Sequence, residues 1–325
     1  MSTAGRIADA LGSRRHVLLL NHVSPDGDCL GSTLALARAL WARGQQATVG
    51  SHDGVPAMYG FLPDSHRIVR DVPDGTVFDA AVFMECSTPD RAGALAARAA
   101  GVPLVVNIDH HVSNAGYGDI RLYDTTAAAV GELVYTVVQA LVPALDAPTA
   151  TCLMTALLTD TGSFRYASVT PRTLMIAADL VAHGASPAEI FTRVYENRPA
   201  AALRLMGLAL SRLTLAEQGR VVWTIVTQEM LKESGASMEE AEGIVGMLCA
   251  IADVAVAILF KEEPDGWRVS LRGRGAVRTH VIAETFGGGG HAAAAGFTAR
   301  GAPGDVVRRT LEVVRRELAA AAAAS

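Results

Sequence analysis

Three apolar segments in the first half of the chain end in acidic and imidazole side chains. The segments are 17–21 (VLLLN), 80–84 (AAVFM) and 104–108 (LVVNI), and the third runs directly into DHHVSN. The polar residues that follow these segments are His22, Asp26, Asp28, Glu85, Asp109, His110 and His111. A further acid, Asp160, ends an Ala/Leu-rich stretch in LLTDTGSFRY. Acids and imidazoles are residue types that bind divalent metal ions.

The carboxylates of this set would conflict with one another if they shared one crevice. Asp26, Asp28, Glu85 and Asp160 would repel each other or take up protons, and bound divalent cations would remove that conflict. Carboxylate and imidazole ligands without a thiolate favour a borderline-hard ion such as Mn²⁺ over structural zinc. Four carboxylates and two imidazoles are too many ligands for one ion that keeps an open position. They suit two ions about 3.5–4 Å apart that share a carboxylate and a water, an arrangement that binds a phosphoryl oxygen.

Each motif also has an ordinary structural explanation when it is taken singly. DGD is typical of a turn, a histidine pair is common at a surface, and Asp160 could simply end a helix. Cys29 and Cys86 lie beside the acids in sequence and are interpreted as small packing residues. The joint occurrence of the motifs at successive strand ends favours the metal site.

The elements that must position these residues are those of an α/β sheet. The apolar segments, with 46–50 (QATVG), alternate with Ala/Leu-rich stretches such as 30–43, which predicts a parallel sheet covered on both faces. Further helices are predicted over 149–158, 171–182 and 186–191. Ligands of open α/β sheets bind beyond the carboxyl ends of the strands. Residues up to about ninety positions apart are therefore expected to converge on one crevice.

The pattern changes near residue 200, and a length of 325 residues favours two domains. We predict a catalytic domain over 1–192, a linker helix over 193–212 and a smaller α/β domain with a mixed sheet over 213–325. The strands predicted in the second domain are 221–226, 254–260 and 267–273. The last two are joined by KEEPDG as an antiparallel hairpin. Helices are predicted over 237–251 and at the C-terminus.

The bulk composition excludes several classes of protein. A net charge of −5 and a pI near 6.0 argue against a broad basic face for long nucleic acid. The sequence has no apolar run of about 18 residues and no signal-like N-terminus, so no membrane partner is expected. The four scattered cysteines are typical of reduced thiols in a cytoplasmic protein.

Five motifs in order resemble a known family. HVSPDGD at 22–28, the acid after the second strand, DHH at 109–111 and DTGSF at 160–164 are similar to the four N-terminal motifs of the DHH phosphoesterases. GGGGHAAAAGF at 287–297 resembles the signature of the DHHA1 domain. The motifs cover nearly the whole chain, whose length resembles that of the NrnA-type bifunctional oligoribonucleases and pAp (3′-phosphoadenosine 5′-phosphate) phosphatases. The implied fold is a parallel-sheet DHH domain joined by a helical linker to a smaller DHHA1 domain.

The resemblance implies a role for each residue of the first domain. The implied ligands of two Mn²⁺ ions, with Mg²⁺ or Co²⁺ as substitutes, are His22, Asp26, Asp28, Glu85, His110 and Asp160. Glu85 would bridge the two ions, although the family usually has aspartate there, which is one methylene shorter. Asp109 would orient the imidazole of its neighbour, His110. His111 would contact the scissile phosphate or give a proton to the leaving oxygen.

Substrate contacts are expected from both domains. The candidate substrate-binding residues are Arg91, Ser163, Arg272, Arg274, Gly288, Gly289, Gly290 and His291. Glycines let a backbone approach a phosphate and cradle it with N–H groups, and HAAAA could begin a helix whose N-terminus attracts anions. Arginine suits bidentate phosphate contacts. The alternatives are a low-complexity glycine run and a solvated arginine face.

The resemblance implies a Mn²⁺-dependent phosphoesterase that acts by two-metal hydroxide attack. It would degrade very short oligoribonucleotides (nanoRNA) to mononucleotides and dephosphorylate pAp to AMP, and the family suggests a homodimer. Two alternatives remain open, a RecJ-like single-strand DNA exonuclease and a catalytically weak nucleotide-binding regulatory protein. A family II inorganic pyrophosphatase shares the first domain but lacks the GGGGH signature.

Overall fold

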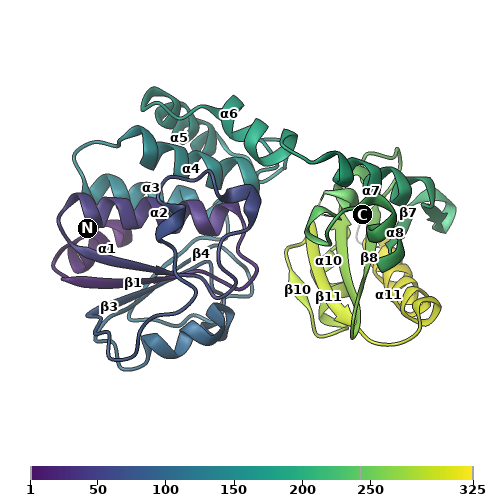
Figure 1. Cartoon of the computed structure of the whole chain (residues 1–325), viewed down its shortest axis with the longest axis horizontal. Helices are drawn as coiled ribbons and strands as arrows, with labels where there is room; N and C mark the ends of the chain where they lie inside the picture. Colours follow the sequence, from purple (N-terminus) through teal and green to yellow (C-terminus); the bar gives the residue numbers. More distant parts are fainter. Residues whose placement is uncertain (1, 242, 324–325) are drawn as a thin grey trace. The chain divides into compact units, whose positions relative to one another are not determined.

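A computed structural model of the chain describes residues 2–241 and 243–323. The chain forms two compact units, Met1–Asn197 and Arg198–Ser325 (Figure 1). Within the described residues, no helix is both long and apolar enough to cross a bilayer.

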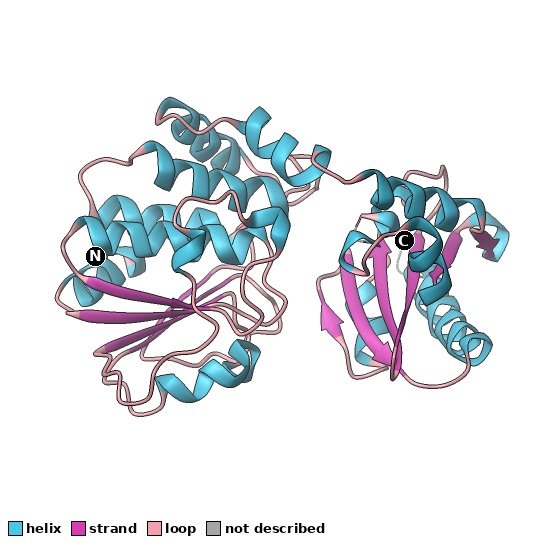
Figure 2. Ribbon diagram, in the orientation of Figure 1, coloured by secondary structure: helices cyan, strands magenta, loops and turns pink. Residues whose placement is uncertain are grey.

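The first unit contains a five-stranded parallel sheet in the order β2-β1-β3-β4-β5 (Figure 2). Its strands are β1 (His16–Leu20), β2 (Gln46–Gly50), β3 (Ala80–Met84), β4 (Val105–Asp109) and β5 (Ile120–Tyr123). All five residues of β3 are buried, as expected of a strand covered on both faces. From β1 the chain runs to β2 on one side, and from β2 it crosses to β3 on the other side of β1. The strand order therefore reverses between β1 and β3, which makes this the topological switch point. Ligands of open α/β sheets bind at such points.

The α-helices of the unit cover one face of this sheet, and a further helical segment with loops covers the other (Figure 1). The helices of the unit are α1 (Thr3–Gly12), α2 (Gly27–Ala42), α3 (Val130–Leu141), α4 (Ala147–Asp160), α5 (Pro171–Ala182) and α6 (Pro187–Phe191). Successive residues of β1 alternate between the two cores, with Val17 and Leu19 on the helical side and Leu18 and Leu20 on the other. On the second face lies η3 (Pro89–Ala99), a 3₁₀ segment interrupted at Gly93.

The second unit contains a six-stranded mixed sheet in the order β10-β11-β9-β8-β7-β6. Its strands are β6 (Thr214–Ala216), β7 (Val221–Val226), β8 (Val256–Glu263), β9 (Gly266–Gly273), β10 (Gly289–Gly290) and β11 (Ala294–Ala299). Only the β7–β8 pair is parallel among these described strands, and β8 and β9 form the predicted antiparallel hairpin. The helices are α7 (Ala200–Ser211), α8 (Gln228–Ser234), α9 (Ile244–Leu248), α10 (Thr279–Glu284) and α11 (Pro303–Ala323). The predicted fold class, a parallel sheet followed by a smaller mixed-sheet domain, is confirmed.

Three local predictions differ from the structure. The segment 193–212 is not one helix: a π-helical turn ends at Glu196 and α7 begins after Pro199, because the residue before a proline disfavours helix. The expected helix over 237–251 is reduced to a turn and the short α9, and residue 242 lies outside the described residues. The HAAAA segment begins no helix: its first residues form a turn and its last alanines begin β11, because pairing with β9 overrides the helix propensity of alanine.

Candidate active site

The loops after β1, β3 and β4 bring two imidazoles to one buried carboxylate. His22 follows β1, Glu85 follows β3 and His110 follows β4. Glu85 Oε2 lies 3.9 Å from His22 Nε2, and Glu85 Oε1 lies 3.7 Å from His110 Nε2. The three residues therefore meet at the switch point of the sheet.

Two helix ends add two further acids to this cluster. Asp26 is the N-cap of α2, where its Oδ1 accepts from the Cys29 N–H at 3.0 Å, and it lies 4.0 Å from His22 Nε2. Asp160 is the last residue of α4, and its Oδ2 lies 3.5 Å from His110 Nε2. The structure thus brings together residues that are far apart in the sequence.

Asp28 is held by the N-terminus of a helix that the sequence analysis did not identify. Its side chain is fully buried and accepts from the N–H groups of Val130 (2.6 Å) and Gly131 (2.9 Å) at the start of α3. The Ser32 hydroxyl donates a third hydrogen bond at 2.9 Å. Helix N-termini stabilise negative charge, so α3 fixes this carboxylate in place.

Both imidazoles turn the same ring nitrogen toward the acids. His22 Nδ1 lies 2.8 Å from the Val23 carbonyl oxygen, and His110 Nδ1 lies 2.9 Å from that of Ala127. A carbonyl oxygen only accepts, so Nδ1 carries the proton in each ring and donates it. This is how metal-binding histidines are commonly oriented, with the other nitrogen directed at the ion.

The cluster carries more negative charge than its own cations balance. Burial, and then repulsion from Asp26 and Asp28, raises the pKa of Glu85 well above its usual value. Burial likewise raises the pKa of Asp160, and that of Asp28 to about 6 although His110 lowers it. Burial lowers the pKa of His110, but Glu85 and Asp160 outweigh it and raise that pKa to about 11. A divalent cation would relieve this imbalance.

The donor atoms form two groups that fit metal ions. One consists of Asp28, His110 and Asp160, whose donor atoms lie within 4.8 Å of one another, and the other has His22, Glu85 and Cys29 within the same limit. Among the described residues, no donor reaches the buried Glu85 Oε2, an atom suited to a metal ligand. Oxygen and imidazole donors of this kind fit Mn²⁺, Mg²⁺ or Co²⁺.

Two features of these groups were not apparent from the sequence. The Cys29 thiol lies among the donor atoms, but burial and the charge of Glu85 raise its pKa well above the usual value and keep it protonated. That agrees with its interpretation as a packing residue. Glu85 adopts a left-handed backbone conformation with φ of 58°, which is uncommon for a residue other than glycine.

The acid of the DHH segment orients His111 and not His110. Asp109 Oδ1 lies 2.7 Å from His111 Nδ1, whereas the ring of His110 is oriented by the Ala127 carbonyl. The expected contact with His110 is therefore wrong for the side chain, although the His110 N–H donates to Asp109 Oδ1 at 2.8 Å. Burial alone would raise the pKa of Asp109, but the bond and charge of His111, with further hydrogen bonds, lower it.

The remaining candidates of the first unit border the cluster. Arg91 is exposed at the start of η3, its carbonyl accepts from the Val23 N–H at 2.7 Å, and its charge helps to lower the pKa of His22, behind the larger effect of burial. Ser163 follows α4 in a left-handed conformation with φ of 61°. The Arg91 charge acts on the His22 imidazole, and the Ser163 side chain bonds to that of Tyr195. Among the described residues, neither interaction assigns a catalytic role.

The glycine-rich candidates form a hairpin at the edge of the second sheet. Gly289 and Gly290 are β10, and the chain turns at His291 into β11. The N–H of Gly288 donates to Ala283 and that of His291 donates to Ala294, so these two amides do not form the predicted cradle. A Cβ on Gly288 would lie 2.2 Å from the carbonyl oxygen of the neighbouring strand, whereas Gly289 faces open space. Among the candidate glycines 288–290, Gly289 is exposed, has no left-handed φ, and has no atom within 4 Å of the position that a Cβ would take. Neither close packing nor its backbone conformation therefore requires a glycine at this position.

The two candidate arginines lie on the same sheet as this hairpin. Arg272 belongs to β9, where it pairs with Ala294 of β11, and its side chain is half-buried. Arg274 follows β9 and is exposed. Arg272 therefore borders the hairpin segment, whereas the Arg274 N–H donates to the Ala255 carbonyl oxygen just before β8.

Comparison with known proteins assigns the chain to a family. The family described as the DHH family, N-terminal domain, matches residues 16–159, and the DHHA1 domain matches residues 219–320. The chain is 35% identical over 309 residues to the bifunctional oligoribonuclease and PAP phosphatase NrnA of Thermus thermophilus, covering 93% of this chain and 90% of that protein. The Bacillus subtilis (strain 168) protein of the same name is 26% identical over 283 residues, covering 86% and 88%.

Solved structures share the fold. An exopolyphosphatase-related protein from Bacteroides fragilis superposes with a TM-score of 0.88 at 23% identity, covering 97% of this chain and 96% of that one. RecJ from Thermus thermophilus, in complex with Mn²⁺, gives a TM-score of 0.55 at 14% identity, covering 99% and 55%. The family matches to both units, together with the 35% identity along almost the whole of two sequences, show that the chain belongs to the DHH and DHHA1 family of phosphoesterases.

Proposed function

We propose that this hydrolase degrades very short oligoribonucleotides to mononucleotides and converts pAp to AMP, with Mn²⁺ as its metal ion. The observation that carries the proposal is the buried cluster of acids and imidazoles around Glu85. Bound divalent cations would balance the excess negative charge of this cluster. The names of the Thermus and Bacillus relatives support the substrate class. RecJ, which shares the fold, was crystallised with Mn²⁺.

The proposed ligands fall into two sets that share Glu85. His22 and Asp26 would complete one set, and the residues of the other are Asp28, His110, Asp160 and again Glu85. Bound divalent ions would supply positive charge that lowers the pKa of water and stabilises the transferred phosphoryl group. The longer glutamate reaches the cluster from the left-handed turn after β3, which supports its place between the two imidazoles.

His111 and Asp109 are the proposed catalytic pair. Asp109 accepts from Nδ1, so the imidazole of His111 presents Nε2 on its other edge. The ionised carboxylate holds the neutral imidazole in the tautomer with its proton on Nδ1. When the ring is also protonated on Nε2, that nitrogen can donate to the leaving oxygen. We assign Arg91 and Ser163 to substrate binding because they border the cluster. In the second unit we assign the same role to the GGGGH hairpin of Gly288, Gly289, Gly290 and His291, and to Arg272 and Arg274.

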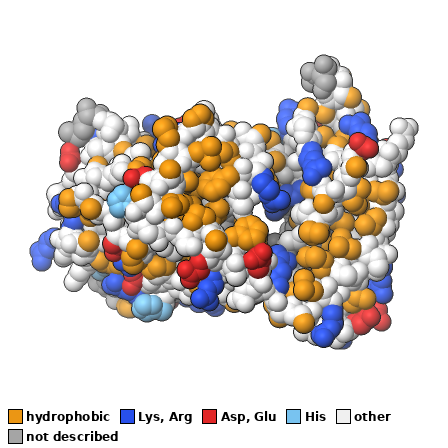
Figure 3. Space-filling model, turned by 90° about the horizontal axis from the view of Figure 1, so that it is seen from above, with side chains coloured by type: hydrophobic (Ala, Val, Ile, Leu, Met, Phe, Trp, Pro, Cys, Tyr) orange, Lys and Arg blue, Asp and Glu red, His pale blue; other side chains and the backbone are white. Residues whose placement is uncertain are grey.

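A homodimer is part of the proposal, and α5 offers a surface for it. Leu174, Met175 and Val181 are exposed to 51%, 66% and 48%, and they lie on the outer face of this helix. Figure 3 shows hydrophobic side chains gathered on the face of the first unit that carries α5 and α6. Light scattering after size-exclusion chromatography tests this point. Met175→Glu should yield monomers if the face joins two copies, and a monomeric wild type would refute the dimer.

A side-by-side assay tests the proposed activity. Phosphate or nucleotide release is measured from pAp, RNAs of two to five nucleotides, longer RNA and single-stranded DNA, with Mn²⁺, Mg²⁺ or Co²⁺ after EDTA treatment. We expect turnover of pAp and the shortest RNAs with Mn²⁺, falling as length grows, and its loss in Asp28→Ala. Preference for long DNA would favour the RecJ-like alternative. Nucleotide binding without hydrolysis under any ion would favour the regulatory protein.

A further inference from the structure

A chain of hydrogen bonds runs from His111 into the interior of the first unit. His111 Nδ1 donates to Asp109 Oδ1 at 2.7 Å, and Asn114 Nδ2 donates to the other oxygen of the same carboxylate at 2.5 Å. Asn114 Nδ2 also donates to Asn107 Oδ1 at 2.8 Å. Both N–H bonds of the Asn114 amide are therefore used, one on the carboxylate and one on a buried residue of β4.

The orientation of both amides follows from partners that can act in only one way. Asn114 Oδ1 accepts from the Gly116 N–H at 2.8 Å, so the oxygen and nitrogen of this amide cannot be exchanged. Asn107 Nδ2 donates to the Cys86 carbonyl oxygen at 3.0 Å, which fixes the second amide in the same manner. A carboxylate and a carbonyl only accept, so each link has one donor and one acceptor.

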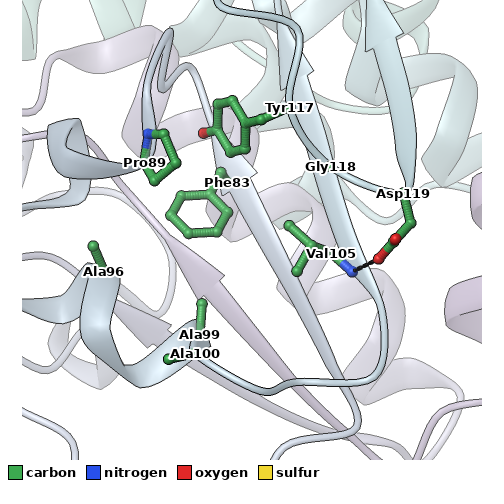
Figure 4. A pocket seen from close by; sticks show the side chains of 9 residues that line it. All are labelled: Phe83, Pro89, Ala96, Ala99, Ala100, Val105, Tyr117, Gly118 and Asp119. Carbon is green, nitrogen blue, oxygen red and sulfur yellow. Dashed lines mark hydrogen bonds between the residues drawn. The ribbon is translucent and has the colours of Figure 1, made fainter.

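The far end of the chain of hydrogen bonds is anchored beside Glu85. The Cys86 carbonyl, which directly follows Glu85, also accepts from the Tyr117 hydroxyl at 2.9 Å. The Tyr117 ring packs edge-on against Phe83 of β3, with ring centroids 5.4 Å apart, and both line a hollow of about 510 Å³ (Figure 4). The loop after β4 is thus tied to the turn after β3.

We propose that Asn114 is a positioning residue for the hydrolysis, acting through Asp109 to hold the imidazole of His111 in one tautomer and one orientation. This inference rests on the proposed function of His111. Asp109 is fully buried, and without Asn114 its Oδ2 would lose its charge-assisted bond. The carboxylate would then be held through Oδ1 alone, by the His111 ring and the main-chain N–H groups of His110 and His111. It could twist about its Cβ–Cγ bond and tilt the imidazole with it. The sequence shows Asn114 only as the last residue of DHHVSN.

Asn114→Asp is the sharpest substitution, because it cuts the chain of hydrogen bonds but spares the turn. The carboxylate keeps an oxygen for the Gly116 N–H and loses both donated bonds to Asp109 and Asn107. Assays at pH 8 favour the ionised form of the new side chain. We expect kcat on pAp to fall about 10- to 100-fold, as for groups that orient a catalytic or ligating histidine, with KM and Mn²⁺ affinity within about twofold of wild type.

Ser113→Asp is the matched control. It adds the same charge at the neighbouring position, where the side chain is exposed and the Asp109 bonds stay intact. An equal fall of kcat in Ser113→Asp would mean that charge near the site, rather than the lost bond, causes the effect, and would overturn the proposal. Should Asn114→Asp fail to fold by circular dichroism, Asn114→Ser removes the two long-reaching donors without adding charge and carries the same expectation.

A double-mutant cycle separates positioning from a general effect on the fold. If Asn114 acts through His111, Asn114→Asp should change kcat by less than about threefold when His111→Ala is already present. If the hydrogen bonds only hold the loop in place, the two losses multiply. Multiplying losses would contradict the positioning role.

A nuclear magnetic resonance measurement gives a readout that needs no activity. In protein labelled with ¹⁵N-histidine, without metal and again with Mg²⁺, the His111 Nδ1–H bonded to Asp109 should give a far-downfield proton resonance. That resonance should broaden or move upfield in Asn114→Asp and persist in Ser113→Asp. Absence of pAp hydrolysis in the wild type would overturn the proposed function alone. A resonance unaffected by Asn114→Asp would overturn the positioning inference alone.

Discussion

Replacing Asp28 with asparagine should change how the stability of the metal-free protein depends on pH. Burial raises the pKa of Asp28 from 3.8 to about 6, against the lowering effect of His110. At about 1.36 kcal/mol per pH unit, the ionised carboxylate costs the folded state roughly 3 kcal/mol. The neutral amide of the variant would carry no such cost, but it would lose one of the bonds from Val130 and Gly131, at about 1–3 kcal/mol at every pH.

The sign follows from which state binds the proton more tightly. The folded state does, because its Asp28 pKa is the higher one, so stability is lost as pH rises from about 4 and the loss is complete above about 6. Between pH 5 and pH 7 the free energy of unfolding of the metal-free wild type should therefore fall by about 1–2 kcal/mol relative to that of Asp28→Asn. Saturating Mn²⁺ should reverse the trend for the wild type, since metal ligands must be deprotonated to bind.

Urea unfolding in EDTA at pH 5, 6, 7 and 8 measures this difference. Far-UV circular dichroism follows the whole chain, and hydrogen exchange of β1 amides follows the first unit alone. Taking the difference between wild type and variant cancels other groups, including His22, whose lowered pKa acts in the opposite direction. Asp9→Asn removes an exposed carboxylate of α1 and serves as the control. A wild-type-minus-variant difference that stays constant from pH 5 to pH 7 would refute the charge argument.

Further predictions concern the metal centre and three glycines. Mn²⁺ at 100 times its Kd should stabilise the wild type by about 2.7 kcal/mol and raise Tm by roughly 5–10 °C. Glu85→Gln should abolish most of that rise without lowering the metal-free Tm, as differential scanning fluorimetry can show. Gly31→Ala should cost about 1–3 kcal/mol in urea unfolding because its Cβ would lie 2.3 Å from the Cys152 carbonyl oxygen. Gly207→Ala, in α7 with open space around it, should instead stabilise by about 0.4–1 kcal/mol. Gly288→Ala should speed hydrogen exchange in β10 and β11 and leave Mn²⁺ affinity unchanged, because its Cβ would meet the opposite backbone. Slower or unchanged exchange there would contradict the close packing of this hairpin.

The sheet and the acids at its edge could be predicted because they depend on short-range patterns. The continuous apolar runs of β1, β3 and β4 show burial on both faces, and the residues just after each run must then lie at one edge. The half-exposed strand β5 carries no such signal, since its residues alternate between intermediate and exposed. The sequence therefore does not mark β5 as a strand.

Features that depend on distant partners could not be predicted from local pattern. The bonds from the start of α3 to Asp28 join residues about a hundred positions apart, and α3 begins without a side-chain cap that would mark it. The choice of His111 over His110 as the partner of Asp109 is set by the Ala127 carbonyl, which takes up the other imidazole. The alanines after His291 have high helix propensity, and only the neighbouring strand β9 explains why they are extended.

Because the backbone at Glu85 is left-handed, selection for thermal stability and selection for turnover should favour different residues at position 85. A glycine there would relax a conformation that costs a side-chain-bearing residue on the order of 1–3 kcal/mol. It would also delete the carboxylate between His22 and His110. Libraries screened only for heat resistance should therefore enrich glycine at position 85 among inactive survivors, while libraries screened for turnover should retain an acid despite its cost.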